Sequence, residues 1–233
     1  MNFPGNFRRL GAIEIDGLRE RALALTDEDW ARESIRQQRY EVHRDTETIP
    51  LVYDLDFRHR DGTRRPALAK FEPALRPALA LVADHYENSP AGRDLCARFG
   101  LGWFVRATLV RLRPGGRIAA HHDMNFSLAH SHRVHLPVIT NDDVRFTVGS
   151  ETLNLKPGEV WEINNRRLHA VANEGTTERV HVILDFVLPG EQCCCGAKRH
   201  PDVPCTPARC LETDRMRIPC TCHPEEAGAC LAS

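Results

Sequence analysis

The chain has 233 residues, with 31 lysines and arginines against 32 aspartates and glutamates. This length can bury the core of one domain, or of one domain with an appendage. A net charge near zero argues against a nucleic acid or an anionic membrane as partner. No stretch approaches the length of a membrane span, and the N-terminus has no apolar signal region before its first charges. We therefore expect a cytoplasmic protein that acts on a small molecule or a peptide.

Three segments in the first hundred residues have the spacing of amphipathic helices. In residues 17–25, GLRERALAL, apolar side chains recur at helical spacing after Asp16, which is a suitable N-cap. Residues 73–87, PALRPALALVADHYE, show the same spacing with proline in the first turn. A shorter helix is expected over residues 91–99, AGRDLCARF. The N-terminal part is therefore predicted to be largely helical.

From Trp103 onward the apolar spacing changes from helical to alternating. Short alternating segments follow one another up to Pro189, separated by glycine, proline and asparagine turns. Such a series is typical of an all-β sandwich or barrel. We therefore predict one mainly β domain over residues 1–190, with the N-terminal helices packed on it.

Cysteine usage marks a second boundary, because Cys96 stands alone and the other eight cysteines all follow residue 192. Residues 191–233 are therefore predicted to form a separate cysteine-rich tail. It has no apolar core, so cross-links or metal would have to order it. The spacings lack a paired Cys-x-x-Cys, and zinc or another soft metal, a flexible thiol-rich tail and disulfides all remain open. The candidate zinc ligands are Cys193, Cys195, Cys205, Cys210, Cys220 and Cys222.

Residues 120–140, AHHDMNFSLAHSHRVHLPVIT, contain five of the twelve histidines. His121 and Asp123 are two residues apart, so on a strand their side chains project from the same face. A lone His-x-Asp is more often a surface pair, but His169 follows on a later predicted strand. Two imidazoles and one carboxylate on one face of a metal leave the opposite positions open, as non-haem Fe(II) oxygenases require. We therefore interpret these three residues as ligands of Fe(II).

Arg179 lies on the strand after His169. A lone arginine is usually solvated or paired with an acid, but a fixed guanidinium fork can also hold the distal carboxylate of a dicarboxylic 2-oxo acid. Together with the three candidate ligands, this arginine favours an oxygenase site.

Four segments, taken in order, resemble the aspartyl/asparaginyl β-hydroxylase family of Fe(II)- and 2-oxoglutarate-dependent oxygenases, and also bacterial proline cis-hydroxylases. They are VRLRPGGRIAAHHD, HRVHLPVITND, LKPGEVWEINNRRLHAVANEG and ERVHVILDF. The resemblance implies a double-stranded β-helix, the cupin-like jelly roll, with iron and 2-oxoglutarate in its mouth. It also implies hydroxylation of an aliphatic C–H bond in an amino acid or a peptidyl residue of the Asp, Asn or Pro kind. Dioxygen is then consumed, and succinate and CO2 are released.

The resemblance also implies roles for individual residues. His121 and His169 match the two histidine ligands, and Arg179 matches the arginine that binds 2-oxoglutarate. Arg133 and His135 match a basic pair that also contacts the co-substrate. The mammalian aspartyl hydroxylases have glycine where this chain has an aspartate, whereas the proline hydroxylases have aspartate. This chain therefore keeps a full triad of two histidines and one carboxylate.

The substrate contacts are less defined by the sequence. Residues 36–53, RQQRYEVHRDTETIPLVY, are expected to cover the mouth of the barrel, and an arginine there would suit a substrate carboxylate. His130 and His132 are expected at the rim or in a loop. The candidate substrate contacts are Gln38, His43, Thr46, Arg106 and Asn125.

A second class of function fits the same features. A jelly roll with histidines at its mouth is also compatible with a non-catalytic, cupin-like metal or ligand sensor whose thiol-rich tail binds a partner. Turnover of 2-oxoglutarate to succinate distinguishes the enzyme from the sensor.

Overall fold

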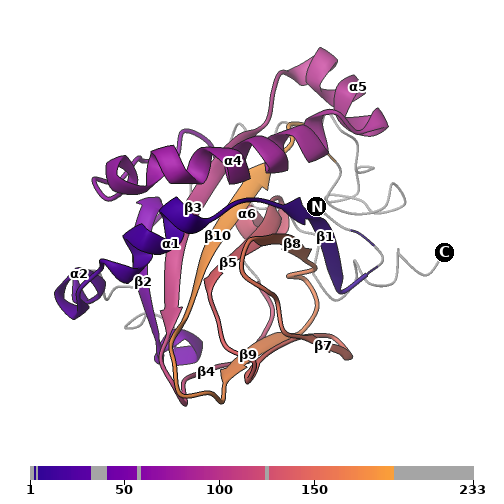
Figure 1. Cartoon of the computed structure of the whole chain (residues 1–233). Coiled ribbons are helices and arrows are strands. Elements are labelled where there is room, and N and C mark those ends of the chain that lie inside the picture. The colour runs from indigo at the N-terminus through magenta and orange to yellow at the C-terminus, as the bar shows by residue number, and fades with distance from the viewer. Residues whose placement is uncertain (1–2, 4, 33–40, 57–58, 124–125, 192–233) are drawn as a thin grey trace.

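A computed structural model of the chain describes residues 3, 5–32, 41–56, 59–123 and 126–191 (Figure 1). The helices are α1 (Asp16–Leu23), α2 (Asp27–Ala31), α4 (Leu68–Glu87), α5 (Pro90–Phe99), α6 (Phe126–Ala129) and the 3-10 turn η1 (Glu41–His43). The strands are β1 (Phe7–Ala12), β2 (Thr46–Val52), β3 (Trp103–Leu112), β4 (Arg117–His121), β5 (His132–Ile139), β6 (Val144–Val148), β7 (Glu151–Leu153), β8 (Glu159–Ile163), β9 (His169–Asn173) and β10 (Arg179–Val187).

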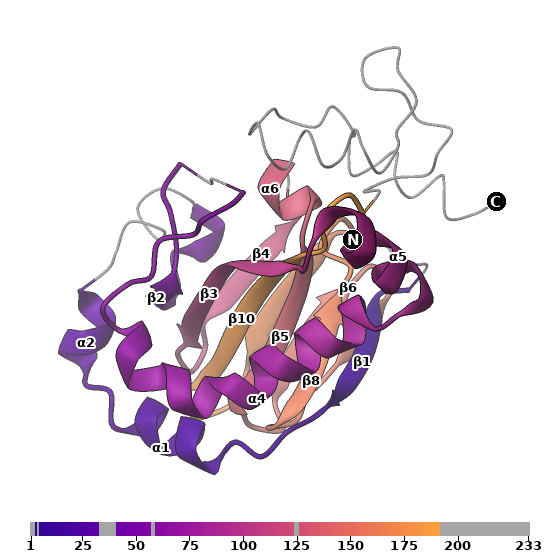
Figure 2. The ribbon, with the colours of Figure 1, turned by 90° about the horizontal axis from the view of Figure 1, so that it is seen from above.

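The strands form two antiparallel sheets. The larger sheet has the order β1-β8-β5-β10-β3-β2, and the smaller has the order β4-β9-β6-β7. One face of the larger sheet is covered by α1 and α4 (Figure 1, Figure 2). The mainly β jelly roll with N-terminal helices packed on it is thus confirmed.

Two apolar cores follow from this arrangement. One lies between the helices and the larger sheet, and includes Leu75 and Val82 of α4 against Leu136 and Val182. The other joins the two sheets around Phe146, with Leu112, Ile118 and Val171 among its members. The central strands β3, β5 and β10 of the larger sheet are therefore buried along almost their whole length, whereas β1 at the edge is partly exposed.

Two of the predicted helices differ from expectation in their first turns. Asp16 is not the cap of α1: it is the first helical residue, and the N-cap Ile15 makes no side-chain hydrogen bond. An acidic residue there still interacts favourably with the helix dipole. α4 begins at Leu68, before Pro73, and continues through Pro77. Leu68 and Phe71 are buried, so the apolar stripe extends one turn further than predicted. α5, with Ser89 as its N-cap, agrees with expectation.

The N-terminal strand β1 is tied to the larger sheet by a buried carboxylate. Glu162 of β8 accepts hydrogen bonds from Nε of Arg8 (2.7 Å) and from Nδ1 of His132 (2.6 Å). Burial opposes ionisation of this carboxyl, but the charges of His132 and Arg8 outweigh it and lower the pKa of Glu162 to about 2. Nε2 of His132 also contacts the Glu191 carboxylate (2.6 Å). Packing against β5 therefore continues at least to residue 191.

Within the part of the chain described, no helix is both long and apolar enough to cross a membrane.

Candidate metal centre

The three predicted ligands converge at one end of the smaller sheet. His121 is the last residue of β4 and His169 the first of β9, and the two are direct cross-strand partners. Asp123 lies two residues beyond β4, where its backbone N–H bonds to the carbonyl of Asn165 (3.2 Å). The ligand atoms of the three residues all lie within 4.8 Å of one another. The structure thus brings these three side chains together, although the aspartate extends from a loop and not from the strand.

Both histidines present the same ring nitrogen to the cluster. Nδ1 of His121 donates to the carbonyl of Ala119 (2.8 Å), and Nδ1 of His169 donates to the carbonyl of Arg167 (3.0 Å). A carbonyl can only accept, so in the neutral rings the proton is on Nδ1 and the lone pair is on Nε2. These Nε2 atoms lie 4.0 and 3.9 Å from the carboxylate oxygens of Asp123.

The protonation states also suit a metal. Burial lowers the pKa of His169 to about 4, so its imidazole is neutral at neutral pH. Burial opposes ionisation of Asp123, but the charge of Arg133, followed by those of His169 and His121, holds the pKa of its carboxyl far below the usual range. Two neutral imidazoles and one carboxylate are the donor set that a divalent iron takes, so the residues present fit Fe(II).

The Asp123 carboxylate belongs to a buried cluster of four charged side chains. Arg133 Nη1 donates to Asp123 Oδ2 (2.8 Å), and its Nε and Nη2 donate to the two oxygens of Asp185 (2.9 and 3.0 Å). Asp185 also accepts from Nε of Arg106 (2.6 Å). Asp185 on β10 lies directly opposite Arg133 on β5 and Arg106 on β3. Two arginines and two aspartates balance one another, as buried charges must.

A second group of basic side chains lies between the two sheets, on β10 and β5. Arg179 is buried, and its Nη2 donates to Nδ1 of His181 (2.7 Å). Nδ1 of His181 lies 3.5 Å from Nδ1 of His135. Burial, followed by the charge of Arg179, holds the pKa of both imidazoles well below the usual value. Arg179 is therefore the cation of this group, with two neutral imidazoles beside it.

The aspartyl/asparaginyl beta-hydroxylase family matches residues 75–189, a range that includes both groups of side chains. The chain is therefore similar to this hydroxylase family over just under half of its length. This similarity supports an oxidoreductase. No curated protein sequence matches the chain.

Among solved structures, the chain is similar to a 2OG-Fe(II) oxygenase family oxidoreductase from Burkholderia pseudomallei. The identity is 14%, the TM-score is 0.47, and the match covers 61% of this chain and 66% of that one. It is also similar to a viral collagen prolyl hydroxylase from Paramecium Bursaria Chlorella virus-1, with 10% identity, a TM-score of 0.47, and coverage of 78% and 96%.

The structure places the predicted substrate contacts in different surroundings. His43 is buried in η1 with its ring 5.4 Å from that of His121, which places it beside the metal centre. Thr46 begins β2, and its hydroxyl donates to the carbonyl of His43 (2.7 Å). Arg106 is buried and bonds to Asp185 and, through Nη1, to Oγ of Ser127 (2.8 Å). Gln38, Asn125 and the six candidate zinc cysteines lie outside the described residues.

The expectation that His130 and His132 lie at the rim or in a loop holds only for His130. Both residues are buried, but His130 lies in the turn after α6, whereas His132 lies in β5. His132 begins β5, and its ring stacks on Tyr86 of α4 with centroids 3.8 Å apart. Residues 126–129 form the short helix α6 before this strand. Because the His132 ring stacks on Tyr86 of α4, it lies on the helix-covered side of the larger sheet.

Asn165 and Asp185 were missed by sequence reasoning. Asn165 follows β8, and its amide donates to Asp123 Oδ2 and to the carbonyl of Leu128, both at 3.1 Å. Nothing in its local sequence indicates this contact. Asp185 did carry a signal: it is a single charge in the apolar run VILDFVLP, and such a residue in a buried strand must be paired.

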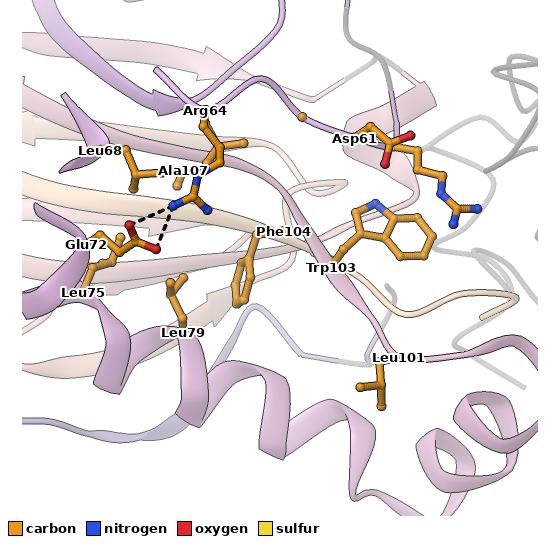
Figure 3. Close-up of a pocket in the computed structure, with 13 residues that line it drawn as sticks. Asp61, Arg64, Leu68, Glu72, Leu75, Leu79, Leu101, Trp103, Phe104 and Ala107 are labelled. Atoms are coloured by element: carbon orange, nitrogen blue, oxygen red, sulfur yellow. Dashed lines mark hydrogen bonds and ion pairs between the residues drawn. The ribbon is translucent and has the colours of Figure 1, made fainter. Parts of the chain in front are cut away.

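A separate hollow of about 490 Å³ lies on the helix-covered side of the larger sheet (Figure 3). Its apolar lining comes from α4 and β3, with Leu75, Leu79 and Phe104 among the side chains. At its rim, Arg64 donates to both carboxylate oxygens of Glu72 at 2.8 Å. None of the three candidate ligands lines this hollow, so it is distinct from the metal centre.

Proposed function

We propose that the chain is an Fe(II)- and 2-oxoglutarate-dependent dioxygenase. The reaction is hydroxylation of an aliphatic C–H bond in an amino acid, or in an Asp-, Asn- or Pro-like residue of a peptide. The observation that carries the proposal is the convergence of His121, Asp123 and His169, with both imidazoles fixed in the tautomer that a metal requires. The similarity of residues 75–189 to the hydroxylase family supports this chemistry.

In this proposal the three converging side chains hold Fe(II). Bound Fe(II) supplies the oxidising chemistry, in which dioxygen hydroxylates the substrate and converts 2-oxoglutarate to succinate and CO2. The protein contributes geometry and charge. The backbone carbonyls of Ala119 and Arg167 keep the two imidazole rings oriented, and burial of His169 keeps its lone pair available at neutral pH.

Arg179 is the proposed anchor for the distal carboxylate of 2-oxoglutarate. A guanidinium can only donate, so Nδ1 of His181 is unprotonated, and the neutral ring carries its proton on Nε2. That Nε2, like Nε2 of His135, is buried and has no hydrogen-bond partner among the described residues. The Phe146 ring lies under the guanidinium, with its centroid 5.8 Å from Cζ of Arg179. A buried cation with additional hydrogen-bonding atoms beside it suits a carboxylate.

The substrate is proposed to enter beside η1, where His43 lies against His121. His43 and Thr46 stay candidate contacts on this side. Arg106 is already neutralised by Asp185, so we expect it to shape the pocket and not to neutralise a substrate carboxylate.

The proposal is tested by incubating the full chain with Fe(II), 2-oxoglutarate and pools of amino acids and peptides. Mass spectrometry then measures succinate and a gain of one oxygen in any component. Substrate must be present, because an oxygenase of this kind can be nearly inactive without it. Succinate together with an oxygenated product supports the enzyme. Metal and 2-oxoglutarate binding without turnover in any pool would support the non-catalytic sensor instead.

A further inference from the structure

The two oxygens of Asp123 have different surroundings. Oδ2 accepts hydrogen bonds from Nη1 of Arg133 (2.8 Å) and Nδ2 of Asn165 (3.1 Å). Oδ1 accepts none from the described residues and lies 4.0 Å from Nε2 of His121. Oδ2 lies 3.9 Å from Nε2 of His169, so both oxygens face the cluster of ligand atoms, but only Oδ2 is held by hydrogen bonds from the protein.

We propose that Arg133 and Asn165 are positioning residues that reserve Oδ2 of Asp123, so that this carboxylate ligates the metal through Oδ1 alone. A carboxylate that binds through one oxygen leaves more coordination positions open than one that binds through both. The reaction in the proposed function, on which this inference rests, needs those open positions for the co-substrate and dioxygen. The contacts to Oδ2 therefore keep coordination positions open for the co-substrate and dioxygen.

Asp185 contributes to the same arrangement, because it fixes the orientation of the Arg133 side chain. Two of the arginine's nitrogens are bonded to the Asp185 carboxylate, and that carboxylate is held from its other side by Arg106. Arg106 is bonded in turn to the hydroxyl and carbonyl of Ser127 (2.8 and 3.2 Å). Arg133 is therefore locked in the orientation that directs Nη1 at Asp123.

This role differs from the one that the family resemblance predicts for Arg133, which is contact with the co-substrate. All three guanidinium nitrogens already donate to carboxylates of the protein. The two roles make opposite predictions. Loss of a positioning residue weakens and alters metal binding, whereas loss of a co-substrate contact weakens 2-oxoglutarate binding and leaves the metal unchanged.

Two altered proteins test the inference without changing the net charge of the buried cluster. Asn165→Ala removes one neutral donor to Oδ2. The double variant Arg133→Met/Asp185→Asn removes one cation and one anion together. The matched control is Asn164→Ala, because the neighbouring Asn164 donates its amide to the carbonyls of Phe3 and Gly5 and makes no contact with Asp123.

The measurement uses the full chain, freed of metal and titrated with Co(II), whose visible absorption reports the number and geometry of its ligands. We expect the single and the double variant to weaken Co(II) binding by about 10- to 100-fold, the range for loss of a group that orients a metal ligand. Their Co(II) absorption should change in shape, and Asn164→Ala should match the unaltered protein. Once saturated with metal, both should bind 2-oxoglutarate within about threefold of the unaltered protein.

Unchanged Co(II) affinity and absorption in both variants would overturn the inference. If 2-oxoglutarate binding were then weakened tens-fold in the double variant, Arg133 would be a co-substrate residue, as the resemblance predicts. A separate outcome concerns the proposed function itself: Co(II) binding that is insensitive to His169→Ala would overturn the metal centre, and the inference with it.

Discussion

Replacing Arg179 with methionine removes the guanidinium that is proposed to hold 2-oxoglutarate, and leaves a side chain of similar length. Arg179 is 1% exposed, so its contact with a ligand is shielded from water. Charge-assisted hydrogen bonds contribute about 1.5–3 kcal/mol each, and a guanidinium fork makes two of them with a carboxylate. A loss of about 3–6 kcal/mol corresponds to binding that is weaker by about 100- to 10,000-fold.

The assay is calorimetric titration of 2-oxoglutarate into the full chain loaded with Mn(II), without oxygen, so that no turnover occurs. The affinity for Mn(II) itself should stay close to that of the unaltered protein, because Arg179 does not touch the three ligands. Arg179→Lys keeps the charge but loses the guanidinium fork. Its affinity for 2-oxoglutarate should therefore lie between that of Arg179→Met and that of the unaltered protein.

Arg111→Met is the matched control. Arg111 is also a buried arginine of the larger sheet, but it lies over the ring of Trp30 and bonds to Glu47 and Asp27, away from the proposed pocket. Its loss should leave 2-oxoglutarate binding unchanged. A dissociation constant for Arg179→Met within about threefold of the unaltered protein would refute the reasoning and move the anchor elsewhere.

Three further predictions use other parts of the chain. His169→Ala should remove Fe(II) binding and turnover together, and retention of stoichiometric iron by elemental analysis with full succinate production would contradict the metal centre. Glu162→Gln should lower the free energy of unfolding at pH 7 by about 3 kcal/mol, because the pKa of this carboxyl is about 2 in the fold against 4.5 unfolded. A carboxyl with a depressed pKa stabilises the fold fully above pH 4.5, and this contribution is lost as the pH falls toward 2. The free energy of unfolding from urea titrations should therefore fall less steeply with acid in the variant than in the unaltered protein. Two parallel curves would count against the contribution of Glu162. Truncation after residue 192 should leave Fe(II) and 2-oxoglutarate binding intact, because the ligands and Arg179 precede it, whereas iron lost with the tail would place the catalytic boundary later; elemental analysis of both chains also tests whether the tail cysteines bind zinc.

The convergence of the three candidate ligands could be predicted because its signal is local in the sequence. His121 and Asp123 are two residues apart, and the alternating pattern places His169 near the start of a strand. The detailed reason was partly wrong, since β4 ends at His121 and the aspartate is held by a backbone bond to Asn165. Spacing predicts that two side chains meet, whereas it does not predict which backbone contacts bring them together.

The contacts around the ligands could not be predicted, because they depend on strand register. Asp185 meets Arg133 and Arg106 only because β10 lies between β5 and β3 in one register. The three residues are far apart in sequence, and alternation alone fixes neither the order of the strands nor their offset. The pairing of β1 with β8 could not be predicted for the same reason. The sequence FRRLGA of β1 does not alternate clearly, and β8 lies about 150 residues later in the chain.

The row of Arg133, Asp185 and Arg106 has a consequence for how the chain folds correctly. Their neighbours Val134, Leu184 and Ala107 face the helix-covered core. Sliding any of the three strands by one residue would carry a charged group into that core, at a cost of several kcal/mol. The charges thus raise the free energy of folds with shifted strands more than they lower the free energy of the native fold. An apolar replacement of all three residues should yield a chain that is still compact but melts with poor cooperativity, because several strand alignments would then have similar energy.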